Sequence, residues 1–278
     1  MHTLVSCALA LVPTLCVVAC VGTGPSATTT LESKVADAKS VTVSIENGRI
    51  EFIKDAKASG IEITAEVRCY GRDQAEADTR LTSAAIVAQP DSTGAVRISV
   101  NLPKRTLGSW GSINSDVTHV TLRAADLTAV TAATTHGSIT IGAFSGSAKL
   151  ETSNGSIRVN GHSGSVDAET SNGSINITGA ATAIAETSNG GITVALGDGA
   201  TGDLRLETSN GSVTVDLPAA WEGTVTADTS VGSINLAGGA VKGKGDSKSM
   251  TIGDATKATA TIETSVGSVT VRPASAKK

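Results

Sequence analysis

The chain has 278 residues, of which 40% are hydrophobic but only 2% are aromatic, and its formal net charge is −4. With so few aromatic rings, the core must be narrow and built from small and β-branched side chains. The negative charge, and a sequence without a dense Lys/Arg cluster, exclude a typical nucleic-acid-binding protein. The one short basic segment, KGKGDSK at 242–248, is predicted to be a loop.

The amino-terminal run TLVSCALALVPTLCVVAC has the length of a signal peptide rather than of a membrane-spanning helix. It ends in Val17-Val18-Ala19-Cys20, which resembles the lipobox of bacterial lipoproteins. In that family the Cys takes a lipid on its sulfur and the peptide is cut just before it. We therefore predict a signal peptide at 1–19, lipidation of Cys20, and a flexible tether through residue 40. The alternative is cleavage by an ordinary signal peptidase, which would leave a secreted protein without an anchor.

The cysteines agree with this processing, because Cys7 and Cys16 leave with the signal peptide and Cys20 would carry lipid. Cys69 then remains as a lone thiol, so the mature chain can form no internal disulfide. In the segment IEITAEVRCY it shares the parity of the apolar residues. We predict that Cys69 is a small buried hydrophobe and not a nucleophile.

Residues 41–105 are predicted to form strands and one helix that together cap the repeats that follow. The segments VTVSIENGRIEFI and GIEITAEVRCYG have the composition of strands. The helix is predicted at about 73–86, with Asp73 as its amino-terminal cap and with Ala77, Leu81 and Ala84 on one face.

A phrase of the form Glu-Thr-Ser-Asn-Gly-Ser-Ile recurs through residues 106–272. Its glycines are spaced 17 to 21 residues apart, except for a last interval of 35 that is either two ordinary periods or one with a long insertion. Such self-similarity is the signature of a repeat architecture. We call these residues the corner glycines: Gly137, Gly155, Gly173, Gly190, Gly211, Gly232 and Gly267.

Each period contains two short strands on either side of a turn. Val166, Ala168 and Thr170 alternate with polar residues before the turn, and Ile175 and Ile177 do so after it, which indicates half-buried strands. We predict an all-β, single-domain β-solenoid with a period of about 17–21 residues and one short helix near its amino-terminal end. An antiparallel meander is the alternative, since Asn-Gly also favours hairpins. Residues 273–278 are predicted to be a polar tail.

Two kinds of side chain would stack into columns if the repeats lie in register. The threonines of the phrase have inward parity and are predicted to be structural. The acidic residues before them have outward parity, where a column would repel itself or attract cations, although one column supplies too few oxygens for a specific calcium site. We call this candidate surface the acidic column: Glu151, Glu169, Glu186, Glu207, Asp228 and Glu263.

We predict no enzymatic activity, no catalytic residue, no metal site and no cofactor. His119, His136 and His162 do not cluster in the sequence, and no familiar hydrolase or metalloprotease motif occurs. Polysaccharide lyases and hydrolases with β-helical folds need a carboxylate-lined cleft, and their rungs are usually rich in aromatic residues. Trp221, in LPAAWEG, is expected to fill the wider turn of its repeat.

The NGSI corners, the helix-bearing front section and the segment VDLPAAWEGTVTADTSVGSI resemble a bacterial family of β-strand-repeat envelope proteins that are named as adhesins, over roughly residues 41–272. The resemblance implies a β-solenoid without an established enzymatic activity. The expected protein is a lipid-anchored scaffold of the cell envelope, with a membrane and an unknown protein or glycan as partners and with no nucleic acid. Alternatives are an accessory or sensor subunit of an envelope stress system and, third, a glycan-active enzyme.

Overall fold

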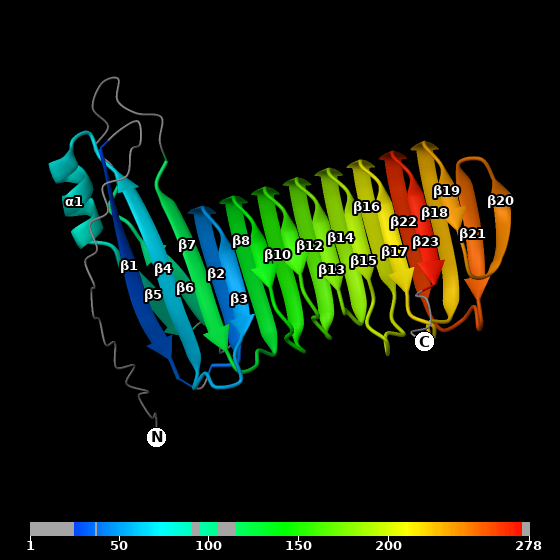
Figure 1. Cartoon of the computed structure of the whole chain (residues 1–278), viewed down its shortest axis with the longest axis horizontal. Helices are drawn as coiled ribbons and strands as arrows, with labels where there is room; N and C mark the ends of the chain where they lie inside the picture. The colour runs from blue at the N-terminus through cyan, green and yellow to red at the C-terminus, as the bar shows by residue number, and fades with distance from the viewer. Residues whose placement is uncertain (1–24, 37, 91–94, 105–114, 274–278) are drawn as a thin grey trace. The chain divides into compact units, whose positions relative to one another are not determined.

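The structure is a computed structural model that describes residues 25–36, 38–90, 95–104 and 115–273 (Figure 1). The described part of the chain is nearly all strand and contains one helix, as predicted. The described residues divide into two compact units, with the boundary between residues 127 and 128. Each unit contributes strands to two sheets.

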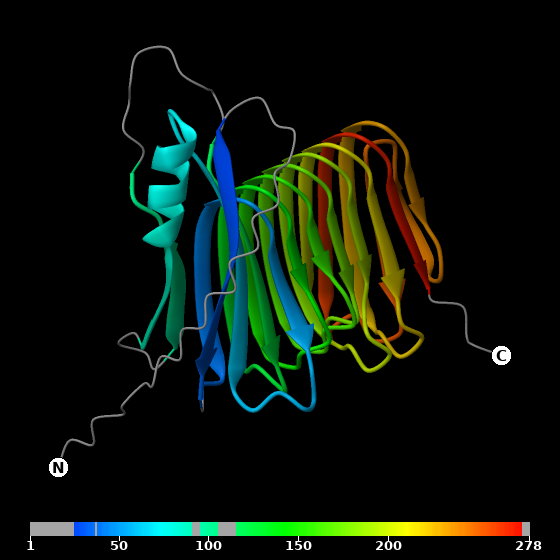
Figure 2. The same cartoon turned by 60° about the vertical axis from the view of Figure 1, so that its left-hand side comes forward.

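The first unit holds one sheet with the strand order β1-β4-β7-β3 and another with the order β2-β6-β5. The helix α1 packs on β1 and β4 (Figure 2). The bounds of these elements are β1 Ser26–Val35, β2 Ser40–Asn47, β3 Ile50–Lys54, β4 Ile61–Tyr70, α1 Gln74–Thr82, β5 Ala85–Pro90, β6 Val96–Asn101 and β7 Val117–Ala124.

Three predicted boundaries in this unit need correction. Strand β1 lies inside the segment predicted as a flexible tether, because it pairs along its whole length with β4. The helix ends at Thr82 instead of residue 86, since Ala85 already begins β5. Strand β7 lies within the range predicted for the solenoid, but it pairs antiparallel with β4 and belongs to the first unit.

Other predictions for the first unit are confirmed. Asp73 caps α1, and its side chain accepts a hydrogen bond from the Glu76 backbone N–H at 2.8 Å. Ala77, Leu81 and Ala84 are buried. Cys69 is fully buried, on the same face of β4 as Val67 and the other apolar residues of that strand.

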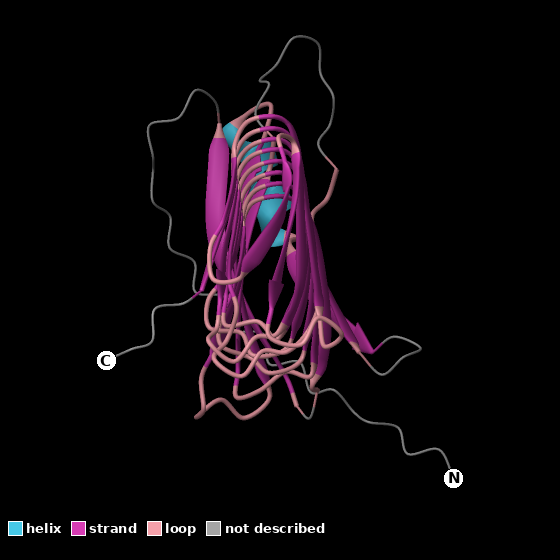
Figure 3. Cartoon of the chain, turned by 90° about the vertical axis from the view of Figure 1, so that its right-hand side faces the viewer, coloured by secondary structure: helices cyan, strands magenta, loops and turns pink. Residues whose placement is uncertain are grey.

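The second unit is a stack of coils, each made of a strand, a tight corner and a second strand. The first strands form one sheet and the second strands form another, so we call these the pre-corner sheet and the post-corner sheet. Figure 3 views the coils along the stack, with the tight corners at the top and longer loops at the bottom. The coils are β8 Ala129–His136 with β9 Ile139–Ile141, β10 Ser147–Asn154 with β11 Ile157–Val159, β12 Ser165–Asn172 with β13 Ile175–Thr178, β14 Thr182–Asn189 with β15 Ile192–Ala195, β16 Leu204–Asn210 with β17 Val213–Leu217, β18 Gly223–Val231 with β19 Ile234–Leu236, and β22 Thr259–Val266 with β23 Val269–Pro273.

Adjacent coils pair in parallel and in register, which confirms the solenoid and excludes the meander. Val166 of β12 lies beside Ala148 of β10, and Ile175 of β13 lies beside Ile157 of β11. Like residues therefore stack on like, and the inward-facing apolar residues of the two sheets form a narrow core between them.

The coils are not stacked in chain order at the carboxyl-terminal end. The post-corner sheet runs β9-β11-β13-β15-β17-β23-β19, so β23 lies between β17 and β19. Strand β22 likewise lies between β16 and β18. The last interval of 35 residues is thus one period with an insertion, and the insertion lets the final coil return into the stack.

The insertion forms a hairpin, so the prediction of a loop at 242–248 is wrong. Strand β20 spans Ala240–Lys244 and β21 spans Ser247–Ile252, and β21 pairs antiparallel with β18. Trp221 is buried, and its indole Nε1–H donates to the Gly202 carbonyl at 3.2 Å. This position confirms that Trp221 fills the wide turn before β18.

Candidate interaction surface

The acidic column is in register along the outer face of the pre-corner sheet. Glu151 lies beside Glu169, which lies beside Glu186, and the row continues through Glu207 and Glu263. Asp228 is last, after Glu263, because the β22–β23 coil lies between the β16–β17 and β18–β19 coils. Parallel strands lie about 4.8 Å apart, so neighbouring carboxylates face one another at close range. The structure thus brings together all six residues that the sequence grouped.

Arg205 relieves part of the repulsion within the column. Its guanidinium reaches Glu186 Oε1 at 3.3 Å and Glu207 Oε2 at 3.1 Å. All three side chains are substantially exposed, so these ion pairs contribute little to stability. Sequence reasoning did not assign Arg205 a role, although its position two residues before Glu207 on a strand places both on one face.

Next to the acidic column, the asparagines of the corners form a ladder of side-chain hydrogen bonds. Asn172 Nδ2 donates to Asn154 Oδ1 at 3.1 Å, Asn189 donates to Asn172 at 3.0 Å, and Asn210 donates to Asn189 at 3.2 Å. We call these four residues the asparagine ladder. Each amide is exposed and keeps at least one N–H and one lone pair beyond the ladder bonds, so the ladder presents a regular row of hydrogen-bonding groups.

The last three residues of the acidic column line an open pocket in the second unit, with a volume of about 450 Å³. Asp246, from the turn of the β20–β21 hairpin, adds a carboxylate that repeat alignment could not find, because the hairpin lies outside the repeats. Within the described ranges, no three His, Cys, Asp or Glu side chains are arranged to hold a metal ion. The polar lining consists of Glu207, Ser209, Asp228, Ser230, Asp246, Ser247, Glu263 and Ser265, with threonines 208, 229 and 264.

The threonine column fixes the position of these surface rows. Thr170 is 2% exposed, and its hydroxyl donates to the carbonyl of Gly155 in the neighbouring corner at 3.0 Å. The same bond recurs in each of six coils, which confirms the inward, structural role predicted for these residues. The donors are Thr152, Thr170, Thr187, Thr208, Thr229 and Thr264.

The corner glycines are required by close approach of backbone. A Cβ atom placed on Gly173 would lie 2.0 Å from the Gly155 carbonyl oxygen, and one on Gly232 would lie 1.8 Å from the Gly267 oxygen. Some corners, such as Gly190, have a positive φ, but this is not common to all of them. Stacking of one corner on the next therefore excludes a side chain at these positions, whatever the φ angle of the glycine.

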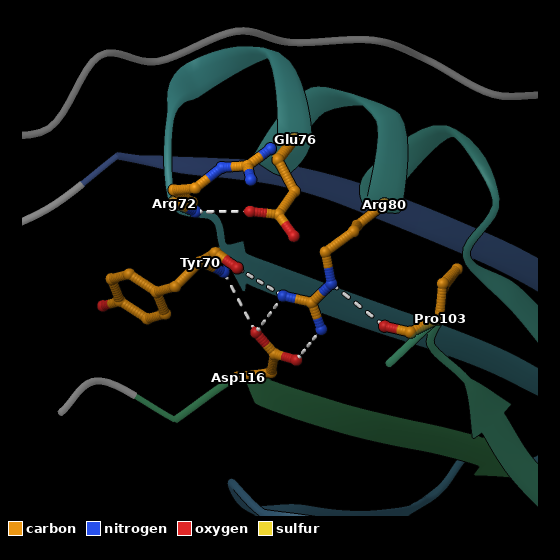
Figure 4. Close-up of polar contacts among 6 residues, drawn as sticks. All are labelled: Tyr70, Arg72, Glu76, Arg80, Pro103 and Asp116. Atoms are coloured by element: carbon orange, nitrogen blue, oxygen red, sulfur yellow. Dashed lines mark hydrogen bonds and ion pairs between the residues drawn. The ribbon is translucent and has the colours of Figure 1, made fainter. Parts of the chain in front are cut away.

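The first unit contains a buried polar cluster around Arg80 (Figure 4). The Arg80 side chain donates from Nε to the Pro103 carbonyl at 3.0 Å and from Nη1 to the Tyr70 carbonyl and to Asp116 Oδ1. Its Nη2 forms an ion pair with the second carboxylate oxygen of Asp116. Asp116 also accepts from the Tyr70 backbone N–H at 3.0 Å. The cluster joins α1 to the ends of β4 and β7.

The cluster also sets the protonation of its neighbours. The hydrogen bond to Asp116 raises the pKa of Arg80, so the guanidinium stays charged despite its burial. Burial, with the negative charge of Asp116, raises the pKa of the Cys69 thiol to about 11. The thiol is therefore protonated at neutral pH, which agrees with the prediction that Cys69 is not a nucleophile.

The three histidines of the described ranges lie in β7, at the end of β8 and in the loop between β11 and β12, apart from one another in the chain as the sequence indicated. His119 Nδ1 accepts a hydrogen bond from the Arg49 backbone N–H at 3.1 Å, and burial lowers the pKa of this imidazole. His162 is fully buried, with Nε2 2.8 Å from the Gly146 carbonyl oxygen. His136 is in register with Asn154 at the head of the asparagine ladder.

The predicted lipidation site Cys20 and the signal peptide at 1–19 lie outside the described residues. The same is true of residues 274–278 of the predicted tail. Among the residues that are described, no helix is long and apolar enough to cross a membrane.

A β-solenoid with in-register polar columns places this chain among the β-strand-repeat proteins. Residues 28–272 match the model of the Toastrack DUF4097 family, and the chain belongs to that family. The family resemblance noted from the sequence is therefore confirmed.

Several solved structures are also similar to the chain, although no curated protein matches it. A "putative cell adhesion protein" from Clostridium sporogenes is 12% identical, with a TM-score of 0.33, over 88% of this chain and 99% of that one. A "putative adhesin" from Bacteroides fragilis is 10% identical, with a TM-score of 0.38, over 88% of this chain and 97% of that one. Another from Parabacteroides merdae is 13% identical, with a TM-score of 0.28, over 91% of this chain and 98% of that one.

Proposed function

We propose that the protein is a non-enzymatic lipoprotein of the cell envelope that acts as an adhesin or interaction scaffold. The observation that carries the proposal is the array on the pre-corner sheet, where the acidic column and the asparagine ladder run parallel to the stack. Between them runs a row of exposed serines: Ser153, Ser171, Ser188 and Ser209. A regular row of identical groups suits many weak contacts with an extended partner, because each contact repeats at the strand spacing.

The anchor is proposed from the lipobox-like segment ending in Cys20. Mass spectrometry of the protein from its native membrane tests it, beside a Cys20→Ser variant. We expect a diacylated or triacylated Cys20 in the wild type, and release of the variant from the membrane. An unmodified amino terminus in the culture medium would contradict the anchor and leave a secreted binding protein.

The binding face is tested with purified envelope material, using cell-wall sacculi and isolated surface polysaccharide as the immobilised probes. A variant with Glu151→Gln, Glu169→Gln and Glu186→Gln changes the pre-corner face of three coils. We expect it to lose about tenfold in apparent affinity, since the contacts act together.

The matched control changes the post-corner face of the same three coils. It carries Arg158→Gln, Asn176→Gln and Thr193→Gln, which are exposed and in register with one another. We expect this variant to bind as the wild type does. Equal binding by both variants, or a loss confined to the control, would show that the acidic column is not the binding face.

A further inference from the structure

The carboxyl-terminal strand pair, β22 and β23, occupies a slot between two coils that precede it in the chain. Ile262 of β22 lies between Leu206 of β16 and Ala227 of β18. Val269 of β23 lies between Val213 of β17 and Ile234 of β19. The pair thus lies inside both sheets, although it follows both neighbouring coils in chain order.

The slot is a specific acceptor for two strands joined by a corner. The inward side chains of the pair are buried, with Ala260, Ile262 and Val269 each 0% exposed. Thr264 donates to the Gly211 carbonyl at 2.9 Å, and Thr229 donates to the Gly267 carbonyl at 3.0 Å. The threonine bonds therefore link the β22–β23 coil to the coil on each side of it. Without the pair, two strand edges and the apolar core between them would be open.

A single short segment, residues 253–258, joins the pair to the rest of the fold. It connects β21 to β22, which lie on opposite sides of β18, so it crosses over the beginning of that strand. The crossing covers two strand spacings, or about 10 Å. Within the described residues no strand follows β23, so the pair joins the rest of the described fold through this segment.

Glu222, just before β18, holds this crossing segment in place. Its carboxylate accepts from the Asp254 backbone N–H at 3.2 Å and pairs with Lys257 Nζ at 2.7 Å. Hydrogen bonding to Lys257 lowers the pKa of Glu222. The Thr224 backbone N–H donates to the Ala258 carbonyl at 2.9 Å, which fixes the end of the crossing.

We infer that the slot between β16–β17 and β18–β19, which the chain's own carboxyl-terminal strand pair fills in the closed form, also accepts that strand pair from a second copy of this chain, so that two copies exchange it when the crossing segment does not close. The exchanged dimer keeps every ladder bond and core contact of the closed chain. The two forms differ only in the crossing segment and in the entropy of association. The conformation that Glu222 stabilises therefore decides between them. This self-association goes beyond the proposed envelope role and does not depend on it.

The test shortens the crossing segment and determines, by a disulfide, whether the strand pair in the slot comes from the same chain or from a second one. Deletion of Asp254–Lys257 leaves two residues between β21 and β22, which reach about 10 Å at full extension and cannot arch over β18. Thr226 and Thr261 are register partners on β18 and β22, so Thr226→Cys with Thr261→Cys reports the partner by a disulfide. The full chain is used, with Cys7, Cys16 and Cys20 changed to Ser.

We expect the deleted chain to have twice the solution mass of the wild type by light scattering, with the disulfide joining two chains on a non-reducing gel. The chain with the intact crossing should be a monomer with an internal disulfide. A folded deletion variant that stays monomeric would overturn the inference. So would a dimer whose disulfides are internal, because it would associate through another surface.

A second measurement covers the case in which the deletion prevents folding. Two differently tagged full chains that carry Glu222→Ala and the cysteine pair are unfolded together and refolded at high concentration. We expect several-fold more interchain disulfide than with native Glu222, whereas Glu62→Ala, which removes a surface pair with Lys34, should match the native chain. Failure of Glu222→Ala to raise the interchain product would sink the proposal.

Discussion

At the scale of single residues, the corner glycines set how closely the coils can stack. The backbone of each corner lies directly on the carbonyl of the next, so that the hydrogen atom of a glycine Cα fills space where no methyl group would fit. The hydroxyl of a threonine in the threonine column donates to the same carbonyl, which also holds that carbonyl at the corner. The residue type is therefore dictated by a contact between coils and not by the turn alone.

This contact predicts that Gly173→Ala is destabilising, because its Cβ would lie 2.0 Å from backbone that cannot move as a flexible side chain can. We expect a loss of about 1–3 kcal/mol in the free energy of unfolding, measured by urea denaturation. Gly199→Ala is the matched control, since nothing lies within 4 Å of its added methyl group. Equal stability of the two variants would contradict the stacking argument.

A second residue-scale prediction concerns the pH dependence of stability. Folding lowers the pKa of His119, chiefly through burial and also through the Arg49 charge, which outweighs the opposing effect of Glu66. The unfolded chain therefore binds the proton more readily, and stability must fall as the pH drops below the ordinary histidine value of 6.5. Protonation would also remove the acceptor for the Arg49 N–H.

We expect the melting temperature of the wild type to fall more steeply between pH 7.5 and pH 5.5 than that of His119→Gln. Glutamine can keep an acceptor at this position and does not titrate. The comparison isolates His119 from carboxylates that titrate at lower pH. The same slope for both proteins would show that this imidazole does not govern the transition.

At the scale of elements, α1 is held to the first unit by the Arg80 cluster as well as by its apolar face. The sequence predicted the face, because Ala77, Leu81 and Ala84 recur at helical spacing. It could not predict the role of Arg80, since arginine on a short helix is usually solvent-exposed and its partner Asp116 is far along the chain. Similarly, β1 was missed because its Ser/Thr-rich sequence also suits a linker.

Asp116→Asn should destabilise the first unit, because it leaves the buried guanidinium of Arg80 without its counter-charge. We expect a loss of about 3 kcal/mol in the free energy of unfolding by urea denaturation. Asp126→Asn is the control, because its pair with Lys54 is solvent-exposed and should change stability by less than about 1 kcal/mol. A loss no larger than that of the control would show that the Arg80 cluster does not stabilise the first unit.

At the scale of the whole chain, the repeat period and its parity determine the stack of coils, the buried threonines and the outward acidic column. They do not determine the order of the last coils. The segments ADTSVGSINL and IETSVGSVTV have nearly the same pattern, so either one fits beside the coil ending at Leu217. The hairpin between them decides, because it pairs with β18 and makes that coil the outer one.

The hairpin also protects the end of the pre-corner sheet. Strand β20 is the outermost strand there and is wholly exposed, and its Lys242 and Lys244 discourage pairing with another edge. We expect Lys242→Thr with Lys244→Thr to raise self-association, measured as light scattering against protein concentration. Lys149→Thr, on the interior strand β10, should leave scattering unchanged. An equal response to both changes would point to net charge instead of the edge.

The bonds between corners have a chemical consequence for the lifetime of the protein. Asn-Gly is the dipeptide that most readily cyclises to a succinimide and then opens to aspartate or isoaspartate, and the attacking atom is the backbone nitrogen of the glycine. In the stack, that nitrogen is occupied, since the Gly155 N–H donates to the Asn172 carbonyl and the Gly173 N–H to the Asn189 carbonyl, both at 2.9 Å. Stacking thus slows deamidation at the four Asn-Gly corners. The amount of isoaspartate at Asn172 would therefore increase with the frequency at which its coil opens.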